Sequence, residues 1–351
     1  MTTAPLKLDF VTLDVFTDTR FLGNPLAVVF VPAALRSQLS QQSKQRIADE
    51  FNLSETVFLH TLDDEPNDTS TTRQIDIFTI GEELTFAGHP TIGTAYLVKN
   101  RLGWSHVDTL LTRAGPIPIT SLQEGGAVRA SIPHAVHIHR QTLSTLLSCP
   151  PPTTTTTAAA VASTIEAGLS PDADIRAAEL SAPVVSIVRG MTFLLIELPT
   201  LEHLSRAGSA PRLDFAQLPD LLDEGEWHDS FVGRYYYVVL QDQSLVADDE
   251  EEGDGRKKKR FALRTRMLSA TFEDPATGSA ASALASYLTI RERAVDGASF
   301  RITQGVEMGR RSEIEIETVA RVEEGESGEV GIKELFLGGT AVEVMSGSVA
   351  V

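Results

Sequence analysis

The sequence contains one cysteine, Cys149, among its 351 residues. A single thiol cannot form an intramolecular disulfide, a zinc site of four thiolates or a catalytic pair of thiols. The glycine-rich patterns of nucleotide-binding loops, G-x-G-x-x-G and G-x-x-x-x-G-K-[ST], are also missing. We therefore expect a protein that works without a thiol pair and without a cofactor.

Positive charge is scarce. The chain carries 30 Lys and Arg against 48 Asp and Glu, which gives a formal net charge of -18. Binding to nucleic acid depends on clustered Lys and Arg, so we expect no nucleic-acid partner. A chain this negative must attract a small anion locally, through backbone N–H groups or a few cations.

Long apolar runs are also lacking. Arg189 interrupts the apolar stretch 182–199, so we expect no membrane-spanning segment and no membrane partner. The first residues do not show the basic segment followed by an apolar segment that marks a secretory signal. The expected location is the cytoplasm.

What is present is the composition of a folded protein with two cores. Apolar residues make up 42% and charged residues 22% of the chain, and its length exceeds that of most single-core domains. Both halves show strand-like segments followed by an amphipathic helix. We expect an α+β protein with one domain over 1–135 and a second over 136–351.

The expected elements are read from hydrophobic periodicity. Ser37 is a candidate N-cap for the first helix. Expected strands cover 6–16, 26–31, 57–60, 73–79, 110–122, 127–133, 184–198, 231–241, 300–302, 313–318, 334–336 and 341–345, and expected helices cover 37–50, 90–99 and 275–288. The Thr-rich tract 150–160 and the acidic-basic tract 248–260 lack core-forming patterns and are expected as surface insertions.

One short pattern occurs twice. His89–Ala95 reads HPTIGTA, and Asp274–Ala280 reads DPATGSA. In an ungapped alignment the Pro, Gly and Ala positions coincide, and Thr94 matches Ser279. Each segment is expected to lead from a strand into a helix, with Pro at the first helical position and His89 or Asp274 as the N-cap.

Small residues in both segments leave room for a ligand. Gly93, Thr94, Gly278 and Ser279 would let an anion approach the first-turn N–H groups, which attract carboxylate or phosphate. A simpler interpretation is that these are two well-capped helices with no ligand. Because the pattern is repeated, we favour helix starts that meet at a ligand cleft between two halves.

Histidines cluster near the expected boundary. His134, His137 and His139 have mixed spacing that does not match a helical metal motif, and no carboxylate partner is evident nearby. We interpret them as linker residues and expect no metal site. Ser279 lies in TGSA, which is not the G-x-S-x-G pattern of a hydrolase nucleophile.

Several motifs occur in a fixed order along nearly the whole chain. They are Asp14-Val15-Phe16 with Gly23-Asn24-Pro25-Leu26-Ala27-Val28, Leu53-Ser54-Glu55-Thr56-Val57-Phe58, Phe86-Ala87-Gly88-His89-Pro90-Thr91-Ile92-Gly93-Thr94-Ala95, Glu273-Asp274-Pro275-Ala276-Thr277-Gly278-Ser279-Ala280 and Gln304-Gly305-Val306-Glu307-Met308-Gly309-Arg310. Together they resemble the phenazine-biosynthesis PhzF-like family, whose fold is that of diaminopimelate epimerase.

The resemblance implies two pseudo-symmetric domains, each a mixed β-sheet wrapped around a central helix, with a substrate cleft between them. It also implies that a glutamate at the position of Glu55 shuttles a proton, as in the isomerisation of trans-2,3-dihydro-3-hydroxyanthranilate. By the same resemblance, His89 and Asp274 act beside Glu55 in the catalytic set. Substrate-binding positions are expected at Gly88, Gly278, Ser279 and Asn24.

The sequence departs from the related epimerases and racemases that use two cysteines. The region that matches one of those cysteines reads Ala87-Gly88 here, and Cys149 lies beside the Thr-rich tract. Two-thiol racemisation is therefore excluded. A solvated glutamate at a strand start is the ordinary interpretation of Glu55, and the resemblance is what favours a catalytic one.

Two functional hypotheses follow. The first is a cofactor-independent isomerase or epimerase that acts on a small anionic, carboxylate-bearing metabolite. The second is a catalytically silent protein that keeps the anion cleft, because a shared fold does not establish activity. A homodimer is expected from the resemblance and from the prevalence of twofold oligomers.

Overall fold

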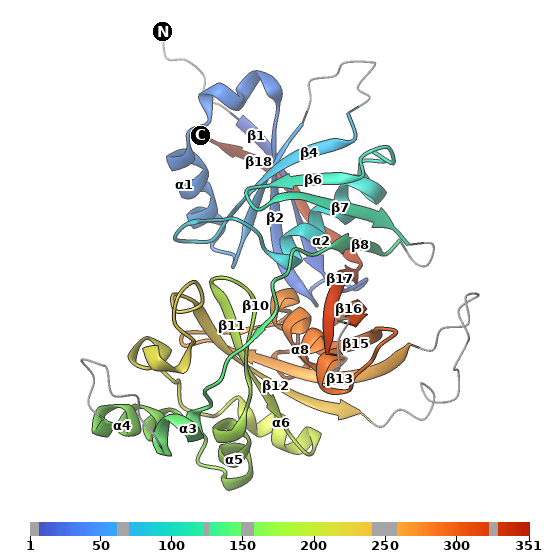
Figure 1. The fold of residues 1–351 in the computed structure, drawn as a ribbon. Coiled ribbons are helices and arrows are strands. Elements are labelled where there is room, and N and C mark those ends of the chain that lie inside the picture. The colour runs from blue at the N-terminus through green and yellow to red at the C-terminus, as the bar shows by residue number, and fades with distance from the viewer. Residues whose placement is uncertain (1–6, 62–69, 123–125, 149–157, 241–257, 323–328) are drawn as a thin grey trace. The chain divides into compact units, whose positions relative to one another are not determined.

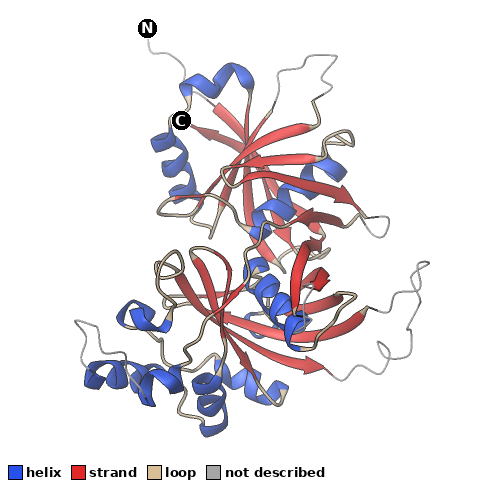
Figure 2. Cartoon of the chain, in the orientation of Figure 1, coloured by secondary structure: helices blue, strands red, loops and turns tan. Residues whose placement is uncertain are grey.

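The computed structural model describes residues 7–61, 70–122, 126–148, 158–240, 258–322 and 329–351. These residues form two compact units built from strands and helices (Figures 1 and 2). Unit 1 consists of Met1–Pro133, Gly309–Ile314 and Phe336–Val351, and unit 2 consists of His134–Met308 and Glu315–Leu335. The expected α+β class is confirmed.

The two units differ from the expected division into 1–135 and 136–351 at the C-terminal end of the chain. Strand β18 (Ala341–Ala350) belongs to unit 1 because it pairs antiparallel with β1 (Lys7–Val15), beginning with Lys7 opposite Ala350. Figure 1 shows the two strands side by side, one blue and one red. Pairing between distant segments leaves no local pattern in the sequence, which is why the division missed it.

Unit 1 is a mixed sheet that surrounds one helix. Its further elements are β2 (Asn24–Val31), the 3-10 helix η1 (Ala33–Gln38), α1 (Gln41–Phe51), β3 (Thr56–His60), β4 (Thr72–Phe78), β5 (Glu83–Leu84), α2 (Gly88–Tyr96), the π-helical turn η2 (Leu97–Arg101), β6 (Thr109–Thr112), β7 (Gly115–Ser121) and β8 (Val128–Ser131).

The strands of unit 1 follow one another in the order β18, β1, β2, β3, β4, β6, β7 and β8. Phe336–Gly339, the end of β17, pairs with β8. Helix α2 contacts β1, β2, β3, β8 and β18. The expected sheet wrapped around a central helix is therefore confirmed for unit 1, and β1 and β2 form the expected antiparallel pair.

Helix α1 packs on the other face of these strands. Ile47 and Ala48 of α1 join Val29 of β2 and Phe58 of β3 in a buried apolar cluster. The helix starts later than the sequence analysis expected, because Ser40 is its N-cap and accepts a hydrogen bond from the backbone N–H of Ser43. Ser37, the candidate N-cap, lies in η1 instead.

Unit 2 repeats this plan and adds helices. Its elements are β9 (His137–Ile138), α3 (Leu143–Ser148), α4 (Ala158–Gly168), α5 (Ala173–Ser181), β10 (Val184–Val188), β11 (Met191–Glu197), α6 (Leu201–Ala207), η3 (Phe215–Gln217), η4 (Pro219–Leu221), β12 (Phe231–Leu240), β13 (Lys259–Leu268), β14 (Glu273–Asp274), α8 (Gly278–Arg291), β15 (Ala298–Gln304) and η5 (Val306–Met308), and the chain passes between units within β16 (Ser312–Val322) and β17 (Val330–Gly339).

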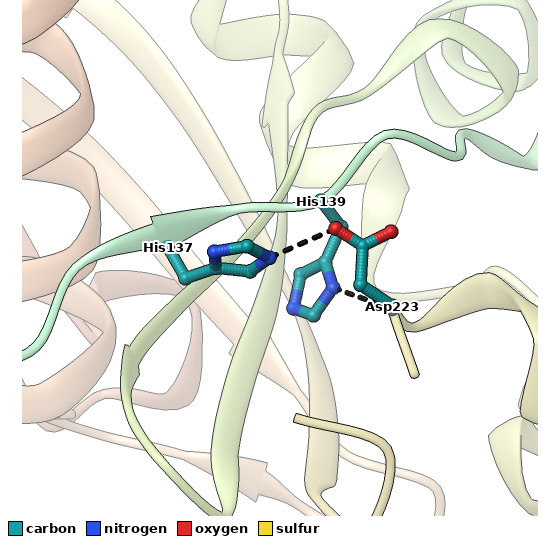
Figure 3. A group of neighbouring side chains, drawn as sticks. All are labelled: His137, His139 and Asp223. Carbon is teal, nitrogen blue, oxygen red and sulfur yellow. Dashed lines mark hydrogen bonds and ion pairs between the residues drawn. The ribbon is translucent and has the colours of Figure 1, made fainter. Parts of the chain in front are cut away.

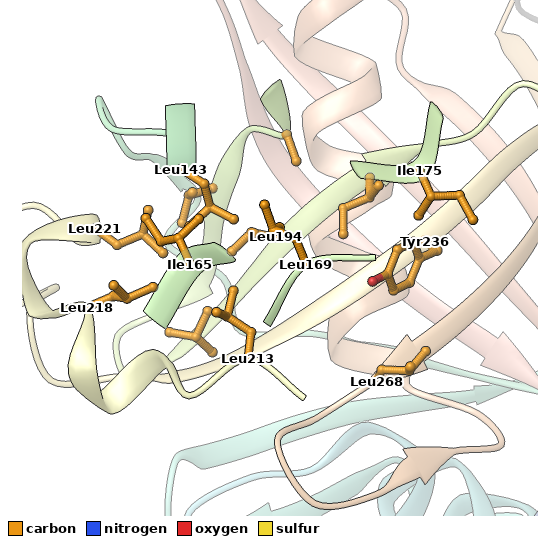
Figure 4. Close-up of a cluster of buried hydrophobic side chains, with 14 of the residues drawn as sticks. Leu143, Ile165, Leu169, Ile175, Leu194, Leu213, Leu218, Leu221, Tyr236 and Leu268 are labelled. Carbon is orange, nitrogen blue, oxygen red and sulfur yellow. The ribbon is translucent and has the colours of Figure 1, made fainter. Parts of the chain in front are cut away.

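The sheet of unit 2 runs in the order β9, β10, β11, β12, β13 and β15. Helix α8 contacts β10, β11 and β15, as the central helix of this unit. Helices α3 to α6 gather on the other side of the strands (Figure 1), where Ile165 and Ile175 pack against Leu194 and Tyr236 in the buried cluster of Figure 4. Successive strand residues point to opposite faces, so both helical layers find an apolar face.

Strand pairing follows the same scheme in the two units. In unit 1, β3 is parallel to β2 and antiparallel to β4, and β4 is parallel to β6. In unit 2, β12 is parallel to β11 and antiparallel to β13, and β13 is parallel to β15. The pseudo-symmetry expected between the halves is thus present in their internal topology.

The low-complexity tracts lie largely outside the described residues. Of the Thr-rich tract, the structure describes only 158–160, which begin α4, and of the acidic-basic tract it describes only 258–260, where β13 begins. Within the described ranges, no helix combines the length and apolar character that crossing a membrane requires.

Candidate active site

Glu55 lies in unit 1 at the entrance to β3. Helix α1 ends at Phe51, and Asn52 closes it in a left-handed conformation (φ 51) with its N–H bonded to the Ala48 carbonyl. The chain then turns and enters β3 at Thr56. This short connection holds the Glu55 side chain at 17% exposure.

Burial changes the acidity of this carboxyl group. It raises the pKa of Glu55 above the ordinary value of 4.5, and a hydrogen bond from the Ser54 side chain opposes the shift only in part. Desolvation has this effect because it disfavours the charged form of an acid. No side chain or backbone group of the described residues donates a hydrogen bond to Glu55 Oε2, which is itself buried.

His89 lies next to this carboxyl group. Its Nε2 atom is 3.7 Å from Glu55 Oε2, and its side chain is only 6% exposed. This separation is longer than a hydrogen bond, and the two groups attract as charges only when the imidazole is protonated and the carboxyl group is ionised. Unit 1 therefore brings together two of the three residues that the sequence analysis expected in the catalytic set.

The start of α2 differs from the expectation. The helix begins at Gly88, its N-cap residue Ala87 makes no side-chain cap, and His89 is the second helical residue. His89 is therefore not the N-cap, and Pro90 is not the first residue of the helix. A proline fits at the third position because the first backbone N–H groups of a helix have no partner within it.

Gly93 and Thr94 serve packing. A Cβ atom at Gly93 would lie 2.6 Å from Leu26 Cδ2 and 2.8 Å from Val15 Cγ2, so a side chain does not fit between helix and sheet. Thr94 is fully buried and donates its hydroxyl to the Pro90 carbonyl at 2.7 Å. The expectation that these two residues admit an anion is wrong. The small residue at the start of α2 is Gly88, directly before this segment.

Asp274 lies in unit 2, in β14, ahead of its helix. The N-cap residue of α8 is Thr277, and Gly278 and Ser279 are its first two helical residues. Asp274 is therefore not the N-cap either. Its Oδ2 atom accepts a hydrogen bond of 2.6 Å from the Thr277 hydroxyl, and this bond ties Asp274 to the residue that starts α8.

The structural repeat has another register than the sequence repeat. In unit 1, Phe78 pairs with Glu83 after a turn in which the Thr79 hydroxyl accepts from the Glu82 N–H. In unit 2, Leu268 pairs with Glu273 after the same turn, built on Ser269. In this register Gly88 matches Gly278 and His89 matches Ser279, whereas the letter alignment matched Gly93 with Gly278.

Asn24 is the first residue of β2 and is buried at 1% exposure. The turn before it depends on Gly23, which has φ +67 and whose Cβ would lie 2.3 Å from the Val15 carbonyl oxygen. Arg310 donates to the Gly23 carbonyl at 2.8 Å and to Asp14 Oδ1 at 2.6 Å. These motif residues therefore fix the position of Asn24.

His137 and His139 are not linker residues. His137 belongs to β9, which pairs with β10, and its Nε2 atom is 2.9 Å from Asp223 Oδ2 (Figure 3). The backbone N–H of Asp223 donates to His139 Nδ1 at 2.9 Å. His139 Nε2 therefore carries the proton and donates to the Ser186 hydroxyl at 2.8 Å.

This arrangement explains the cluster without a metal ion or catalysis. Both ring nitrogens of His139 are engaged, so neither has a lone pair available for a cation, although His137, His139 and Asp223 are near enough in space to be considered as ligands. His139 also cannot serve Ser186 as a base, because its Nε2 is the protonated nitrogen. The cluster joins β9 to the segment after η4.

Gln304, Thr277 and Arg310 had no expected role, yet each bonds to an expected site residue or to its neighbour in the chain. All three lie in the motifs. Gln304 donates to the Asp274 carbonyl, and the Thr277 hydroxyl donates to the Asp274 carboxylate. Arg310 donates to the Gly23 carbonyl, next to Asn24. A polar residue at the end of a buried strand was the available signal for Gln304. Asp223 left no such signal, since it lies 84 positions from His139.

The sequence of this chain is similar to those of known proteins. Residues 13–347 match the family model of the PhzC-PhzF phenazine biosynthesis-like proteins. An uncharacterized isomerase of Mesorhizobium japonicum is 31% identical over 97% of both chains. The trans-2,3-dihydro-3-hydroxyanthranilate isomerase of Pseudomonas aeruginosa is 30% identical over 86% of this chain and 87% of its own.

The fold also matches solved structures. A PhzF-family phenazine biosynthesis protein of Bacillus anthracis aligns with a TM-score of 0.63 at 20% identity, over 99% of this chain and 100% of its own. At that identity the likeness concerns the fold alone, and it agrees with the expected diaminopimelate epimerase-like architecture.

Proposed function

This chain belongs to the PhzC-PhzF family of phenazine biosynthesis-like proteins, and from that membership we propose that it is a cofactor-independent isomerase that moves a proton within a small carboxylate-bearing metabolite. The names of its relatives support isomerase or epimerase activity in general. The proposal goes further by naming Glu55 as the residue that takes and returns the proton.

The observation that carries the proposal is the state of Glu55. Its buried carboxyl group has a raised pKa and lies 3.7 Å from His89 Nε2. General acid–base catalysis is most efficient when the pKa of the group lies near the working pH, so that both protonation states are accessible. A carboxyl group with an unshifted pKa would be a weak base and would rarely hold a proton to return.

In the proposed reaction the Glu55 carboxylate removes a proton from a substrate carbon. The C–H bond breaks, its electron pair moves into the adjoining conjugated system, and Glu55 becomes a neutral acid. The same acid then gives the proton to another carbon, so atoms and charges balance without a redox partner. His89 is proposed to hydrogen-bond an anionic or hydroxyl group of the substrate.

Substrate binding is proposed at the helix starts and at the β2 turn. Gly278 and Ser279 begin the 14-residue helix α8, whose first backbone N–H groups have no acceptor within the helix. Gly88 begins α2, and Asn24 follows the fixed turn before β2. Asp274 is proposed to bind a polar substrate group. The cleft expected between the halves stays a prediction.

The compound to test first is trans-2,3-dihydro-3-hydroxyanthranilate, the substrate in the names of three relatives. Incubation in deuterated water should place deuterium on a substrate carbon. Glu55→Gln keeps the shape of the side chain but cannot titrate, so incorporation should fall by at least ~100-fold while binding changes little. Glu50→Gln, an exposed position on α1, is the control.

The result also separates the alternatives. Near-normal incorporation by Glu55→Gln would remove Glu55 from the mechanism. Binding of the compound without any incorporation by the wild-type protein would favour the silent anion-binding protein. Epimerisation would instead require that small amino or hydroxy acids exchange their α-proton in the same assay.

A homodimer is proposed on the resemblance alone. Sedimentation velocity at micromolar concentration should give about twice the chain mass of 38.0 kDa. A single species at the mass of one chain would contradict this part of the proposal.

A further inference from the structure

Gln304 holds the segment that leads into α8. It ends β15, is fully buried, and donates from Nε2 to the Asp274 carbonyl at 2.8 Å and to the Thr277 hydroxyl at 3.0 Å. Its Oε1 atom accepts from the Thr277 N–H at 3.3 Å. One side chain thus bonds to both ends of the turn between Asp274 and the helix.

The hydrogen bonds require an amide. The Asp274 carbonyl accepts only and therefore needs the Nε2 donor, whereas the Thr277 N–H donates only and needs the Oε1 acceptor. Tyr235, which is fully buried, places its hydroxyl 3.0 Å from the same Oε1 and 3.0 Å from Thr265 Oγ1. Burial keeps the pKa of Tyr235 above its ordinary value, so this hydroxyl stays a donor.

The side-chain bonds continue to the Asp274 carboxylate. The Thr277 hydroxyl accepts from Gln304 Nε2 and donates to Asp274 Oδ2 at 2.6 Å. Gln304 therefore orients this carboxylate through Thr277 and fixes the backbone immediately before Gly278 and Ser279. Partners that are themselves held by buried hydrogen bonds keep a functional group in one geometry.

Unit 1 has no amide side chain at the position that matches Gln304. In unit 2, Thr265 pairs with Gln304. The residue of unit 1 that matches Thr265 is Ile75, and the preceding residue, Gln74, pairs with Leu111. The residue that matches Gln304 is therefore Thr112. Thr112 bonds within its own turn, to the Gly115 carbonyl and the Ala114 N–H. The fold therefore does not require an amide here, since unit 1 builds the same turn and helix start without one.

We propose that Gln304 is a positioning residue, which orients Asp274 and the first turn of α8 for the carboxylate-bearing substrate. The inference rests on the proposed function for the identity of that substrate. It concerns binding and orientation, and it assigns no proton transfer to Gln304.

Gln304→Glu is the sharpest variant because it has the same shape. An ionised carboxylate cannot donate to the Asp274 carbonyl, and it brings a second negative charge beside Asp274. When protonated, the same side chain has one donor and one acceptor, so it can restore the bond to the Asp274 carbonyl and the bond from the Thr277 N–H, but not the second donation that Gln304 Nε2 makes to the Thr277 hydroxyl. The defect of this variant should therefore diminish as the pH is lowered, which a defect caused by lost packing would not do.

Two measurements test the proposal. The first is backbone hydrogen exchange at Thr277, which needs no ligand and should speed up by roughly tenfold in Gln304→Glu at neutral pH. The second is calorimetric binding of 3-hydroxyanthranilate, an aromatic relative of the first test compound that cannot undergo the isomerisation. Its affinity should fall by roughly tenfold or more.

The matched control is Thr318→Val, which removes another buried hydroxyl of unit 2. Thr318 bonds to the Thr289 hydroxyl at 2.8 Å and to the Ala298 N–H at 3.0 Å, away from the turn. It should leave exchange at Thr277 and ligand binding unchanged. Tyr235→Phe, which removes one partner of Oε1, is the milder second variant and should shift both measurements in the same direction by less.

The outcomes are distinguishable. Unchanged exchange at Thr277 in Gln304→Glu, or faster exchange with unchanged affinity, would overturn the positioning role. A wild-type protein that does not bind 3-hydroxyanthranilate would count against the proposed substrate class, and exchange at Thr277 would then decide whether Gln304 orients the turn. Lost affinity that returns at low pH in Gln304→Glu supports the proposal.

Discussion

At the position where unit 1 carries Glu55, unit 2 carries Gly233. The match follows from strand pairing, because Thr56 pairs with Phe78 in unit 1 as Arg234 pairs with Leu268 in unit 2. A Cβ at Gly233 would lie 3.3 Å from atoms of two neighbouring phenylalanine rings, so this position leaves little room for a side chain. The proposed proton-transferring residue therefore occurs in one unit only.

The neighbouring position shows what unit 2 gains instead. Arg234, at 1% exposure, donates to Glu179 Oε1 at 3.0 Å and to the Gly168 carbonyl at 3.1 Å. Glu179 is fully buried and also accepts from the Ser170 N–H at 2.7 Å and the Tyr236 hydroxyl at 2.5 Å. Because the two units share one topology, the same region holds a buried ion pair in unit 2 and the carboxyl group of Glu55 in unit 1.

The largest expected effect is on the stability of unit 2. Glu179→Gln leaves the buried Arg234 without its counter-charge, which typically costs about 3–5 kcal/mol. Urea unfolding should show this loss, and Glu202→Gln, whose side chain is 78% exposed, should change stability by less than about 0.5 kcal/mol. Equal effects of the two variants would show that the buried pair does not stabilise this part of β12.

The next effect concerns the pH at which a buried group of each unit stops contributing to stability. Burial, with the neighbouring His137 charge, lowers the pKa of His139 from 6.5 to about 4. The unfolded chain takes up this proton more readily, so the stability contributed is present above pH 6.5 and is lost as the pH falls through about 4. The full loss is on the order of 3 kcal/mol, and unfolding at pH 7, 5.5 and 4 should reveal it.

The buried Asp76 of unit 1 should lose its contribution only at lower pH. Burial opposes ionisation of Asp76, but hydrogen bonds from His60 and Lys44 outweigh it and lower the pKa of Asp76 well below 3.8. Its contribution is present above pH 3.8 and is lost only below it. His139→Gln should therefore flatten the stability profile between pH 6.5 and 4 and leave the steeper loss below it. An unchanged slope in that variant would contradict the assignment.

The third prediction concerns the length of the Glu55 side chain. Glu55→Asp keeps the charge but withdraws the carboxyl group by one methylene, and a displacement of about 1 Å typically costs about 100-fold in rate. Solvent-deuterium incorporation measures the loss, with Glu50→Asp as the exposed control. A rate within a few-fold of wild type would mean that the position of this carboxyl group does not limit proton transfer.

The smallest expected effect is a gain in stability. Because burial raises the pKa of Glu55, the folded protein favours the neutral form, and this preference adds stability below pH 4.5 that is lost as the pH rises through the folded-state pKa. Glu55→Gln should thus stabilise the protein by roughly 1 kcal/mol at pH 8, a usual size for replacing a strained functional group. The gain should vanish at pH 4, and a gain independent of pH would point to packing.

Local periodicity predicted most strands and all three expected helices, because alternation and helical spacing are properties of short segments. Helix starts were harder. The preference of proline for the first helical position predicted helix starts at Pro90 and Pro275. Pro90 is instead the third residue of α2, and Pro275 precedes α8 by three residues. Any of the first helical positions accepts a residue without an N–H, so proline alone does not fix the start.

Long-range features could not be derived from short patterns. The sequence repeat was recognised from identical residue types. The structural repeat is instead a turn followed by a short strand, and the residue on which this turn is built differs between the units: Thr79 in unit 1 and Ser269 in unit 2. The resemblance named Glu55 and His89 as site residues, and the structure shows them to be neighbours. Gln304 needed the structure, since its role depends on a turn that lies elsewhere in the sequence.

The pairing of β1 with β18 has a consequence for how the chain is made. Lys7 and Ala350 are partners, so the ribosome must synthesise nearly everything between them before the sheet of unit 1 can be completed. Most of unit 2 is synthesised earlier and can collapse while β1 still has an open edge. An unpaired edge strand is prone to join other chains, so slow or interrupted translation should expose the N-terminal strands of nascent chains to aggregation and to chaperones.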